Sequence, residues 1–217
     1  MKKISYLLII TYIICAGIDR INFGPNITES FLILPHLILS LLFVTFQLLF
    51  RTESINFNWF YKQRLIFIST ILFFIFLILS CFFSIDMFFS FKRLVLVFII
   101  IGTVLLILSS LNNEELDNCL YLGSIFGSLL FYLFNVLLFM HWLNLFNFNN
   151  DYMNFSPNII EYFYPRLGGF SLDPNRGSFL IIFYTYILFI NKKENIFKNI
   201  ILIINIFFIF TSFSRTG

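Results

Sequence analysis

Charged and turn-forming residues gather in one short stretch of this chain, between two apolar segments. The stretch covers residues 165–177 and reads Pro-Arg-Leu-Gly-Gly-Phe-Ser-Leu-Asp-Pro-Asn-Arg-Gly. Its arginines, Arg166 and Arg176, offer planar and permanently charged guanidinium groups whose geometry suits phosphate oxygens. A third arginine, Arg215, follows two apolar segments later within Ser-Arg-Thr-Gly. These residue types predict a binding site for an anionic group.

The sequence Asp173, Pro174, Asn175 is typical of the start of a helix. An Asp at this position accepts hydrogen bonds from free backbone N–H groups, and Pro suits the first helical position. A helix N-terminus favours an anion, because its first N–H groups have no partner within the helix. Gly168 and Gly169 allow the preceding backbone to bend close to such a ligand. The sequence therefore predicts that an apolar helix begins at this turn, with the anion site beside it.

A purely structural role accounts for part of the stretch. A capped helix with a tight re-entry loop is enough to explain Asp173, Pro174 and the two glycines. A single arginine is most simply explained by snorkelling to a membrane surface or by pairing with a nearby acidic residue. Three neighbouring arginines, Arg166, Arg176 and Arg215, are harder to explain in this way, and they favour the anion site.

The composition predicts an integral membrane protein. Of the 217 residues, 59% are hydrophobic and 12% are charged, and the mean hydropathy is +0.92. A soluble domain of this size could not bury so many apolar side chains, whereas lipid can surround them. The net charge of +3 is small and scattered, so we expect no nucleic-acid partner. The three cysteines are far apart in apolar stretches and predict neither a disulfide framework nor a metal site.

Seven apolar segments are long enough, or nearly so, to cross a bilayer as helices. They cover residues 4–18, 30–50, 65–85, 94–111, 119–143, 177–191 and 197–213. The sequence therefore predicts an all-α, polytopic helix bundle in which residues 1–217 form a single transmembrane domain. The first segment follows Lys2 and Lys3, as in a signal peptide, but no small-residue cleavage site comes after it. We expect it to be retained as the first transmembrane helix.

The positions of the lysines predict that the N-terminus is cytoplasmic. With this orientation every lysine except Lys92 falls on the cytoplasmic side, as the positive-inside rule expects. The arginines of the candidate site then lie on the outer side, although outer loops usually avoid positive charge. The pair Lys92 and Arg93 lies on that side too and is a further candidate for binding the anion.

Three separated motifs resemble the bacterial O-antigen ligase and O-antigen polymerase family. The first is Arg-x-x-Gly-Phe-x-x-Asp-Pro-Asn at residues 166–175, at the start of an apolar helix. The second is Ser-x-Ser-Arg at residues 212–215, near the end of the next helix. Residues 79–86, followed by Ser-Phe-Lys-Arg at 90–93, are similar to a short outer loop of the family. The resemblance covers about residues 65–217 and depends on the order and spacing of these motifs.

The resemblance implies a glycosyltransferase at the outer face of the bacterial inner membrane. Such enzymes move a glycan from an undecaprenyl pyrophosphate carrier to a sugar hydroxyl. The acceptor belongs to another carrier-linked repeat unit in a polymerase, or to the lipid A core in a ligase, and we favour the polymerase slightly. By similarity, Arg166 and Arg215 bind the pyrophosphate, followed by Arg176, Lys92 and Arg93. The reaction then needs no metal or other cofactor, because cations already surround the leaving group.

The chain departs from the family beyond residue 217. Family members continue with a large outer loop that carries a functional histidine, and then with further helices. His36, within the second apolar segment, and His141, beside an interfacial tryptophan, do not take that place. Glu161 and Asp173 are possible bases, but nothing favours them over structural roles. We therefore expect a truncated or split product and assign no catalytic residue.

Two other functions stay open at this point. A transporter or flippase of lipid-linked glycan could line its path with the same arginines. Transporters place ionisable residues within several spans. Residues 65–85 and 94–111 contain no Asp, Glu, Lys, Arg or His, which weighs against this alternative. A non-catalytic membrane scaffold is the third alternative, and an incomplete enzyme would be consistent with it.

Overall fold

The computed structural model describes residues 2–16, 35–50, 63–145, 168–169 and 174–213, and the fold is built from these. Their secondary structure is entirely helical, which confirms the predicted all-α class. The helices are α1 (Lys2–Cys15), α2 (Pro35–Phe50), α4 (Arg64–Phe82), α5 (Met87–Ser110), α6 (Asn113–Trp142), α7 (Pro174–Ile190) and α8 (Ile196–Phe213).

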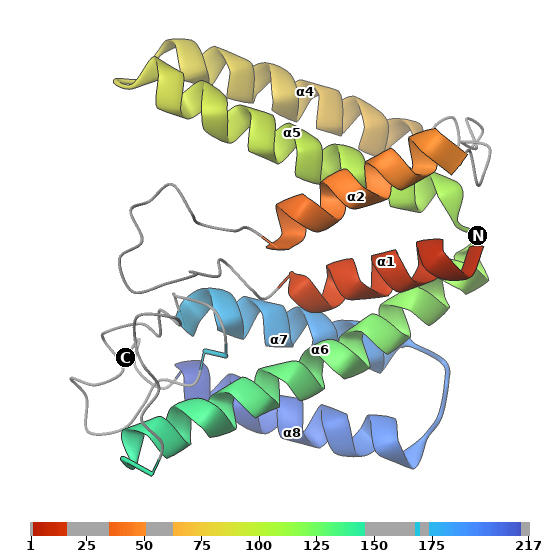
Figure 1. Ribbon diagram of the computed structural model, residues 1–217, viewed down its shortest axis with the longest axis vertical. Helices are drawn as coiled ribbons and strands as arrows, with labels where there is room; N and C mark the ends of the chain where they lie inside the picture. Colours follow the sequence, from red (N-terminus) through yellow and green to blue (C-terminus); the bar gives the residue numbers. More distant parts are fainter. Residues whose placement is uncertain (1, 17–34, 51–62, 146–167, 170–173, 214–217) are drawn as a thin grey trace.

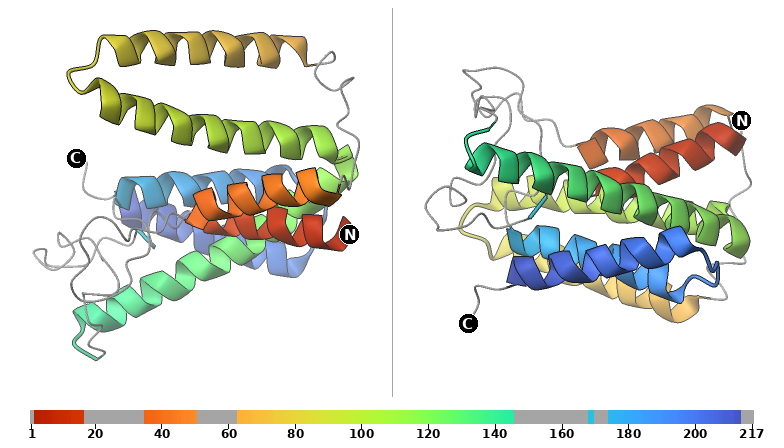
Figure 2. Two further views of the ribbon diagram at one scale, coloured as in Figure 1. Left: turned by 45° about the horizontal axis from the view of Figure 1, so that its top comes forward. Right: turned by 90° about the horizontal axis from the view of Figure 1, so that it is seen from below.

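Successive helices run in alternate directions through the bundle (Figure 1). One end, which we call the Gly168 end, holds the turn between α4 and α5, the last turn of α6, the start of α7 and the end of α8. The opposite end holds the chain's N-terminus, the turn between α5 and α6, and the connection between α7 and α8. The two further views show the same arrangement (Figure 2). Elements far apart in the sequence therefore share one end of the molecule.

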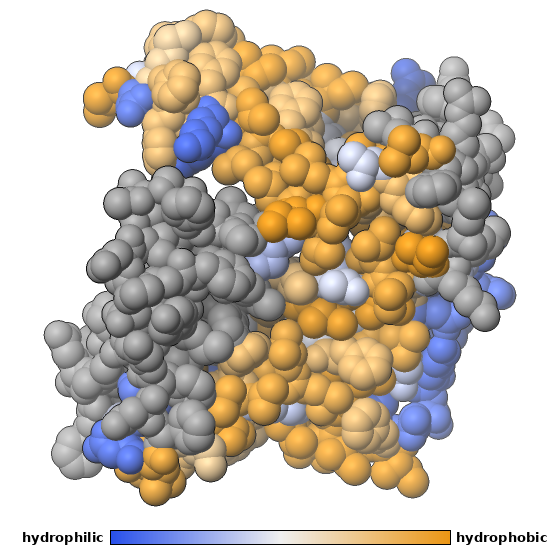
Figure 3. All heavy atoms as spheres, in the orientation of Figure 1, coloured by the Kyte–Doolittle hydropathy of each residue, from blue (hydrophilic) through white to orange (hydrophobic). Residues whose placement is uncertain are grey.

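The outer surface of the helices is largely apolar, and Figure 3 shows hydrophobic side chains over most of the described face. Large side chains such as Phe76, Phe88 and Phe189 are exposed. Two helices, Met87–Ser110 and Asn113–Trp142, are long and apolar enough to cross a membrane, judged by length and composition. The other described helices contain shorter apolar runs. The structure thus holds two candidate membrane spans, and the crossing of all seven helices stays a prediction.

Two helices begin earlier than the apolar segments predict. Helix α5 begins at Met87 instead of residue 94, because the Asp86 carboxylate accepts a hydrogen bond from Phe89 N at 2.9 Å and caps it. Lys92 and Arg93 consequently lie on the helix and not in a loop before it. The prediction was wrong because it took charged residues as helix boundaries.

Helix α6 likewise begins at Asn113 instead of residue 119. The Glu115 carboxylate accepts a hydrogen bond from Asn112 N at 3.2 Å, just before the first turn. Glu114 and Glu115 both lie in that turn, where negative charge complements the positive end of the helix dipole. The acidic residues therefore start the helix.

Small residues on α6 allow α1 and α7 to pack closely against it. A Cβ atom at Gly123 would lie 2.7 Å from the Ile13 side chain of α1. A Cβ atom at Gly127 would lie 2.5 Å from the Tyr184 ring of α7. Both distances are shorter than a carbon–carbon contact allows, so each glycine creates a notch that a neighbouring side chain fills.

Tyr184 joins three helices through the notch at Gly127. Its side chain is fully buried, and its hydroxyl donates a hydrogen bond to the Ile13 carbonyl oxygen at 2.7 Å. That carbonyl belongs to the last turn of α1 and also accepts a hydrogen bond from Ala16 N at 3.3 Å. The contact links α7 to α1 across the surface of α6.

A buried polar cluster holds α8 against α6. The Tyr132 hydroxyl of α6 lies 3.0 Å from the Ile201 carbonyl oxygen and also bonds Asn205 Oδ1, both on α8. Asn205 Nδ2 donates in turn to Ser128 Oγ at 3.2 Å. Both ends of the buried Asn205 amide are therefore satisfied.

We expect Gly127→Ala to destabilise the bundle, because the new methyl group must displace the Tyr184 ring. The expected loss is about 1–3 kcal/mol, seen as a lower midpoint of thermal unfolding for the protein purified in detergent. Gly102→Ala is the matched control: Gly102 lies within α5 with nothing within 4 Å of its added Cβ, and alanine favours helices. Equal midpoints for the two variants would contradict the close packing at Gly127.

Candidate anion-binding site

The structure describes part of the predicted site. Helix α7 begins at Pro174, as the Asp-Pro-Asn turn predicts, and Asn175 and Arg176 follow in its first turn. Gly168 and Gly169 are described and buried. Three predicted residues, Arg166, Asp173 and Arg215, lie outside the described residues, so the cap expected from Asp173 is not tested.

Gly168 lies directly against the first turns of α7. A Cβ atom built on Gly177 would collide with the Gly168 carbonyl oxygen, and both residues are buried. Gly168 therefore packs against the helix that follows it in the sequence. A side chain at residue 177 would prevent this approach, which explains the last glycine of the stretch.

Gly169 forms the bend expected of the double glycine. Its φ angle of 64° lies in the left-handed region, which favours glycine. An added Cβ atom would lie 2.5 Å from the Phe131 ring of α6. Gly169 N donates a hydrogen bond to Asn135 Oδ1 at 2.8 Å. Helix α6 thus contacts Gly169, and α7 contacts Gly168.

Asn135 contacts the bend but is not among the site residues that the sequence predicts. Its side chain is 1% exposed, and its Nδ2 atom has no hydrogen-bond partner among the described residues. The sequence feature that could have identified it is a set of residues four positions apart, which lie on one face of α6. They are Gly123, Gly127, Phe131 and Asn135. An amide at the end of a row that packs against neighbouring helices marks a buried polar contact.

Lys92 and Arg93 lie at the Gly168 end but in another group of helices. Both side chains are exposed on α5, and Arg93 Cζ lies 4.4 Å from the centroid of the Phe89 ring. Helix α5 packs against α2 and α4, whereas α7 packs against α6 and α8. The described structure therefore does not bring this pair beside the double glycine.

The end of α8 lies near the start of α7. The two helices pack against each other and run in opposite directions (Figure 1). The last residue of α8, Phe213, is consequently at the Gly168 end, two positions before Arg215 in the chain. Arg166 and Arg215 themselves lie outside the described residues, so it stays a prediction that the two arginine motifs face the same side of the molecule.

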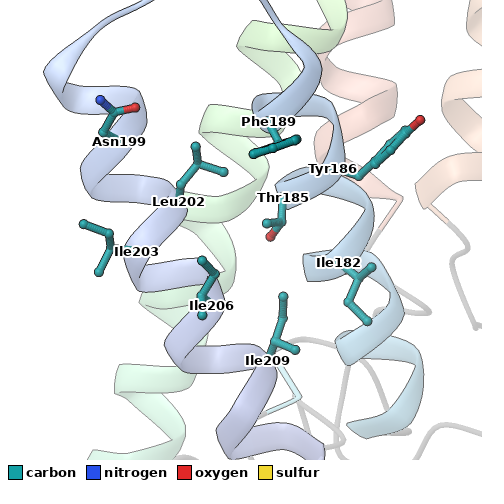
Figure 4. Close-up of a pocket in the computed structure, with 9 residues that line it drawn as sticks. All are labelled: Ile182, Thr185, Tyr186, Phe189, Asn199, Leu202, Ile203, Ile206 and Ile209. Carbon is teal, nitrogen blue, oxygen red and sulfur yellow. The ribbon is translucent and has the colours of Figure 1, made fainter.

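Two hollows lie away from this site. An apolar groove of about 480 Å³ runs between α7 and α8, and Figure 4 shows Thr185, Phe189, Leu202 and Ile206 directed into it. A second hollow of about 500 Å³ at the opposite end is lined by both acidic and lysine side chains of α6 and of the α7–α8 connection. Neither adjoins Gly168 or the start of α7 among its lining residues.

The described geometry suits an anion at the start of α7. The first turn of the helix carries backbone N–H groups without partners within the helix, and its dipole places partial positive charge there. The Asn135 amide nitrogen adds a further donor beside the Gly169 bend. Both kinds of donor suit oxygen atoms that carry negative charge, and the anion itself stays a prediction.

We expect Gly169→Ala to lower the free energy of unfolding by about 1–3 kcal/mol. The loss combines the left-handed backbone with the contact to Phe131, and chemical denaturation in detergent measures it. Phe131→Ala removes the second cause only, so the glycine substitution should cost less in that background. An equal cost in both backgrounds would show that the Phe131 contact does not constrain the bend.

The chain was also compared with known proteins. No protein-family model, no curated protein and no solved structure matches it.

Proposed function

We propose that this chain is a membrane glycosyltransferase of surface polysaccharide assembly, with its N-terminus in the cytoplasm of a bacterium. It acts at the outer face of the inner membrane and takes a glycan from undecaprenyl pyrophosphate. The acceptor is a second carrier-linked repeat unit in the favoured polymerase reaction, and the lipid A core in a ligase reaction. The observation that carries the proposal is the motif at residues 166–175, whose double glycine bends against the first turns of α7.

The described residues next to the three motifs of the family resemblance lie at one end of the bundle, which supports the proposal. The turn between α4 and α5, the start of α7 and the end of α8 all lie at the Gly168 end (Figure 1). In the turn between α4 and α5, Ser90 Oγ donates a hydrogen bond to Ser84 Oγ at 2.6 Å, and Asp86 caps α5. An enzyme that binds the polar head of a lipid-linked substrate needs its polar motifs on one side of the membrane.

The chemistry accounts for the residue types at this end. Negative charge builds on the pyrophosphate as the glycosidic bond breaks, and fixed donors stabilise that charge in the transition state. Guanidinium groups at Arg166 and Arg215 would supply charge-assisted hydrogen bonds of about 1.5–3 kcal/mol each. The N–H groups at the start of α7 would supply further donors at no cost in reorganisation.

The opposite end carries the features expected of the cytoplasmic side. Lys193 Nζ bonds Asn118 Oδ1 there and lies 5.0 Å from the centroid of the Tyr121 ring. Lys198 is 7% exposed and donates to the Asn191 carbonyl oxygen at 2.6 Å, just after α7 ends. Lysines in this position favour an orientation with that end in the cytoplasm.

The proposal predicts that Arg166→Ala and Arg215→Ala, made in the gene as its organism carries it, reduce polysaccharide assembly about 10- to 150-fold each. Gel analysis of surface polysaccharide measures the effect. A polymerase defect leaves single repeat units attached to the cell, whereas a ligase defect leaves polymer on its lipid carrier.

Arg64→Ala is the matched control for these variants. Arg64 is exposed at the first residue of α4, at the opposite end of the bundle, so its loss should leave the polysaccharide unchanged. Normal chain length and attachment in both Arg166→Ala and Arg215→Ala would refute the proposed function.

The orientation gives a separate prediction. Ile85, in the turn between α4 and α5, and Glu194, in the connection between α7 and α8, are exposed at opposite ends. With the native cysteines replaced, Ile85→Cys should react with a membrane-impermeant maleimide on spheroplasts, and Glu194→Cys should react only after lysis. The reverse pattern would place the candidate site in the cytoplasm and rule out an outer-face reaction.

A further inference from the structure

Asn135 lies in the interior of the bundle, and among the described residues only one of its two side-chain polar atoms has a hydrogen-bond partner. Its side chain is 1% exposed, and Oδ1 accepts from Gly169 N at 2.8 Å. Its Nδ2 atom has no acceptor among the described residues. An amide carries two N–H donors at this atom, so both of these are left to bind something beyond the described part of the chain.

The orientation of this amide follows from its partner. Gly169 N is a donor, and only the oxygen of an asparagine side chain can accept from it. Oδ1 must therefore face the glycine, and Nδ2 must take the other position on the same carbon atom. The unpaired donors lie beside the Gly169 bend for this chemical reason.

Asn205 shows how the same bundle satisfies a buried amide. Its Oδ1 bonds the Tyr132 hydroxyl, its Nδ2 donates to Ser128 Oγ, and its side chain is fully buried. Asn135 has the same residue type and the same burial but lacks the second contact. Ser124 Oγ is unpaired among the described residues as well, but it lies eleven residues earlier on α6, away from the bend.

The groups around Asn135 indicate which kind of ligand would accept the hydrogen bonds of its Nδ2 atom. Gly169 adjoins Gly168, which lies against the first turns of α7 at Gly177. That helix start has unpaired N–H groups and partial positive charge. The Asn135 donors and the positive end of the α7 dipole suit a ligand that only accepts hydrogen bonds and carries negative charge, and phosphate oxygens meet both conditions.

We infer that the Asn135 amide donates a hydrogen bond to a phosphate oxygen of the group that binds at the start of α7. Under the proposed function, on which this choice of ligand rests, the group is the pyrophosphate of the lipid carrier. Asn135 is then a ligand-binding residue that also positions the Gly168–Gly169 bend. One side chain sets the shape of the site through its oxygen and contacts the substrate through its nitrogen.

The test uses the full chain in phosphatidylcholine nanodiscs, with inorganic pyrophosphate as the probe. Pyrophosphate should raise the unfolding temperature of the unsubstituted protein by several degrees, and inorganic phosphate should raise it less. Asn135→Asp keeps an oxygen for Gly169 N but replaces the donors with a group that repels phosphate, so the shift should disappear. Asn135→Leu removes the donors without adding charge, and its affinity for pyrophosphate should fall about tenfold or more.

Asn205→Asp is the matched control. It places the same substitution at a buried amide whose two ends are already paired, so the protein should lose stability but keep its response to pyrophosphate. The unsubstituted protein gives a second measurement that does not depend on folding of any variant. Its Asn135 side-chain amide signal, observed by ¹⁵N NMR, should move on addition of pyrophosphate, and the Asn205 signal should not.

The outcomes separate this inference from the proposed function. A full response to pyrophosphate in Asn135→Asp and Asn135→Leu, or a stationary Asn135 signal, would overturn the inference and leave the arginine phenotypes intact. Absence of any response in the unsubstituted protein would overturn it too. Stabilisation by phosphatidylglycerol nanodiscs, lost in Asn135→Asp, would support the contact to phosphate but assign it to a lipid headgroup instead of the carrier.

Discussion

The close approach of α1 and α7 to α6 is the constraint on which the rest of the structure depends. In the proposed membrane setting, lipid tails are as apolar as the side chains, so helices associate through close packing and interhelical hydrogen bonds. The notches at Gly123 and Gly127 supply the packing, and Tyr184 adds a hydrogen bond to Ile13. Helix α6 contacts α1, α7 and α8. Helix α5 joins the bundle through α2 and through the cluster that Ile107 and Leu111 form with Ile9 and Cys119, and α4 packs on α5. Every described contact that shapes the Gly168–Gly169 bend is made by α6 or α7.

The sequence is sufficient to predict the helices but not all of their ends. Runs of apolar residues identify each helix, because a segment that crosses lipid must satisfy its own backbone hydrogen bonds, and a helix does so. The starts of α5 and α6 differ from the prediction for a shared reason. A hydropathy pattern takes Asp86 and Glu115 for the polar residues of loops, but each accepts a backbone N–H and begins a helix. Capping depends on local geometry that such a pattern does not contain.

The candidate site, too, is predicted from the sequence only in part. The start of α7 at Pro174 and the bend at Gly169 follow from local residue types, because proline and glycine restrict or widen backbone angles wherever they occur. The contact between Asn135 and Gly169 joins residues 34 positions apart, and no local rule predicts it. What the sequence does contain is one amide in an otherwise apolar part of α6. That feature predicts a buried polar contact without naming its partner.

The row with a spacing of four on α6 connects packing with chemistry. Gly123 and Gly127 admit neighbouring side chains, Phe131 lies against Gly169, and Asn135 bonds the same residue. All four positions belong to one continuous helix, so the packing that brings α7 to α6 also sets the distance from the start of α7 to the Asn135 amide. Donors held in this way need no rearrangement when charge develops on a ligand, which is the condition under which they stabilise it most. The anion site proposed here would therefore be a property of the helix packing itself.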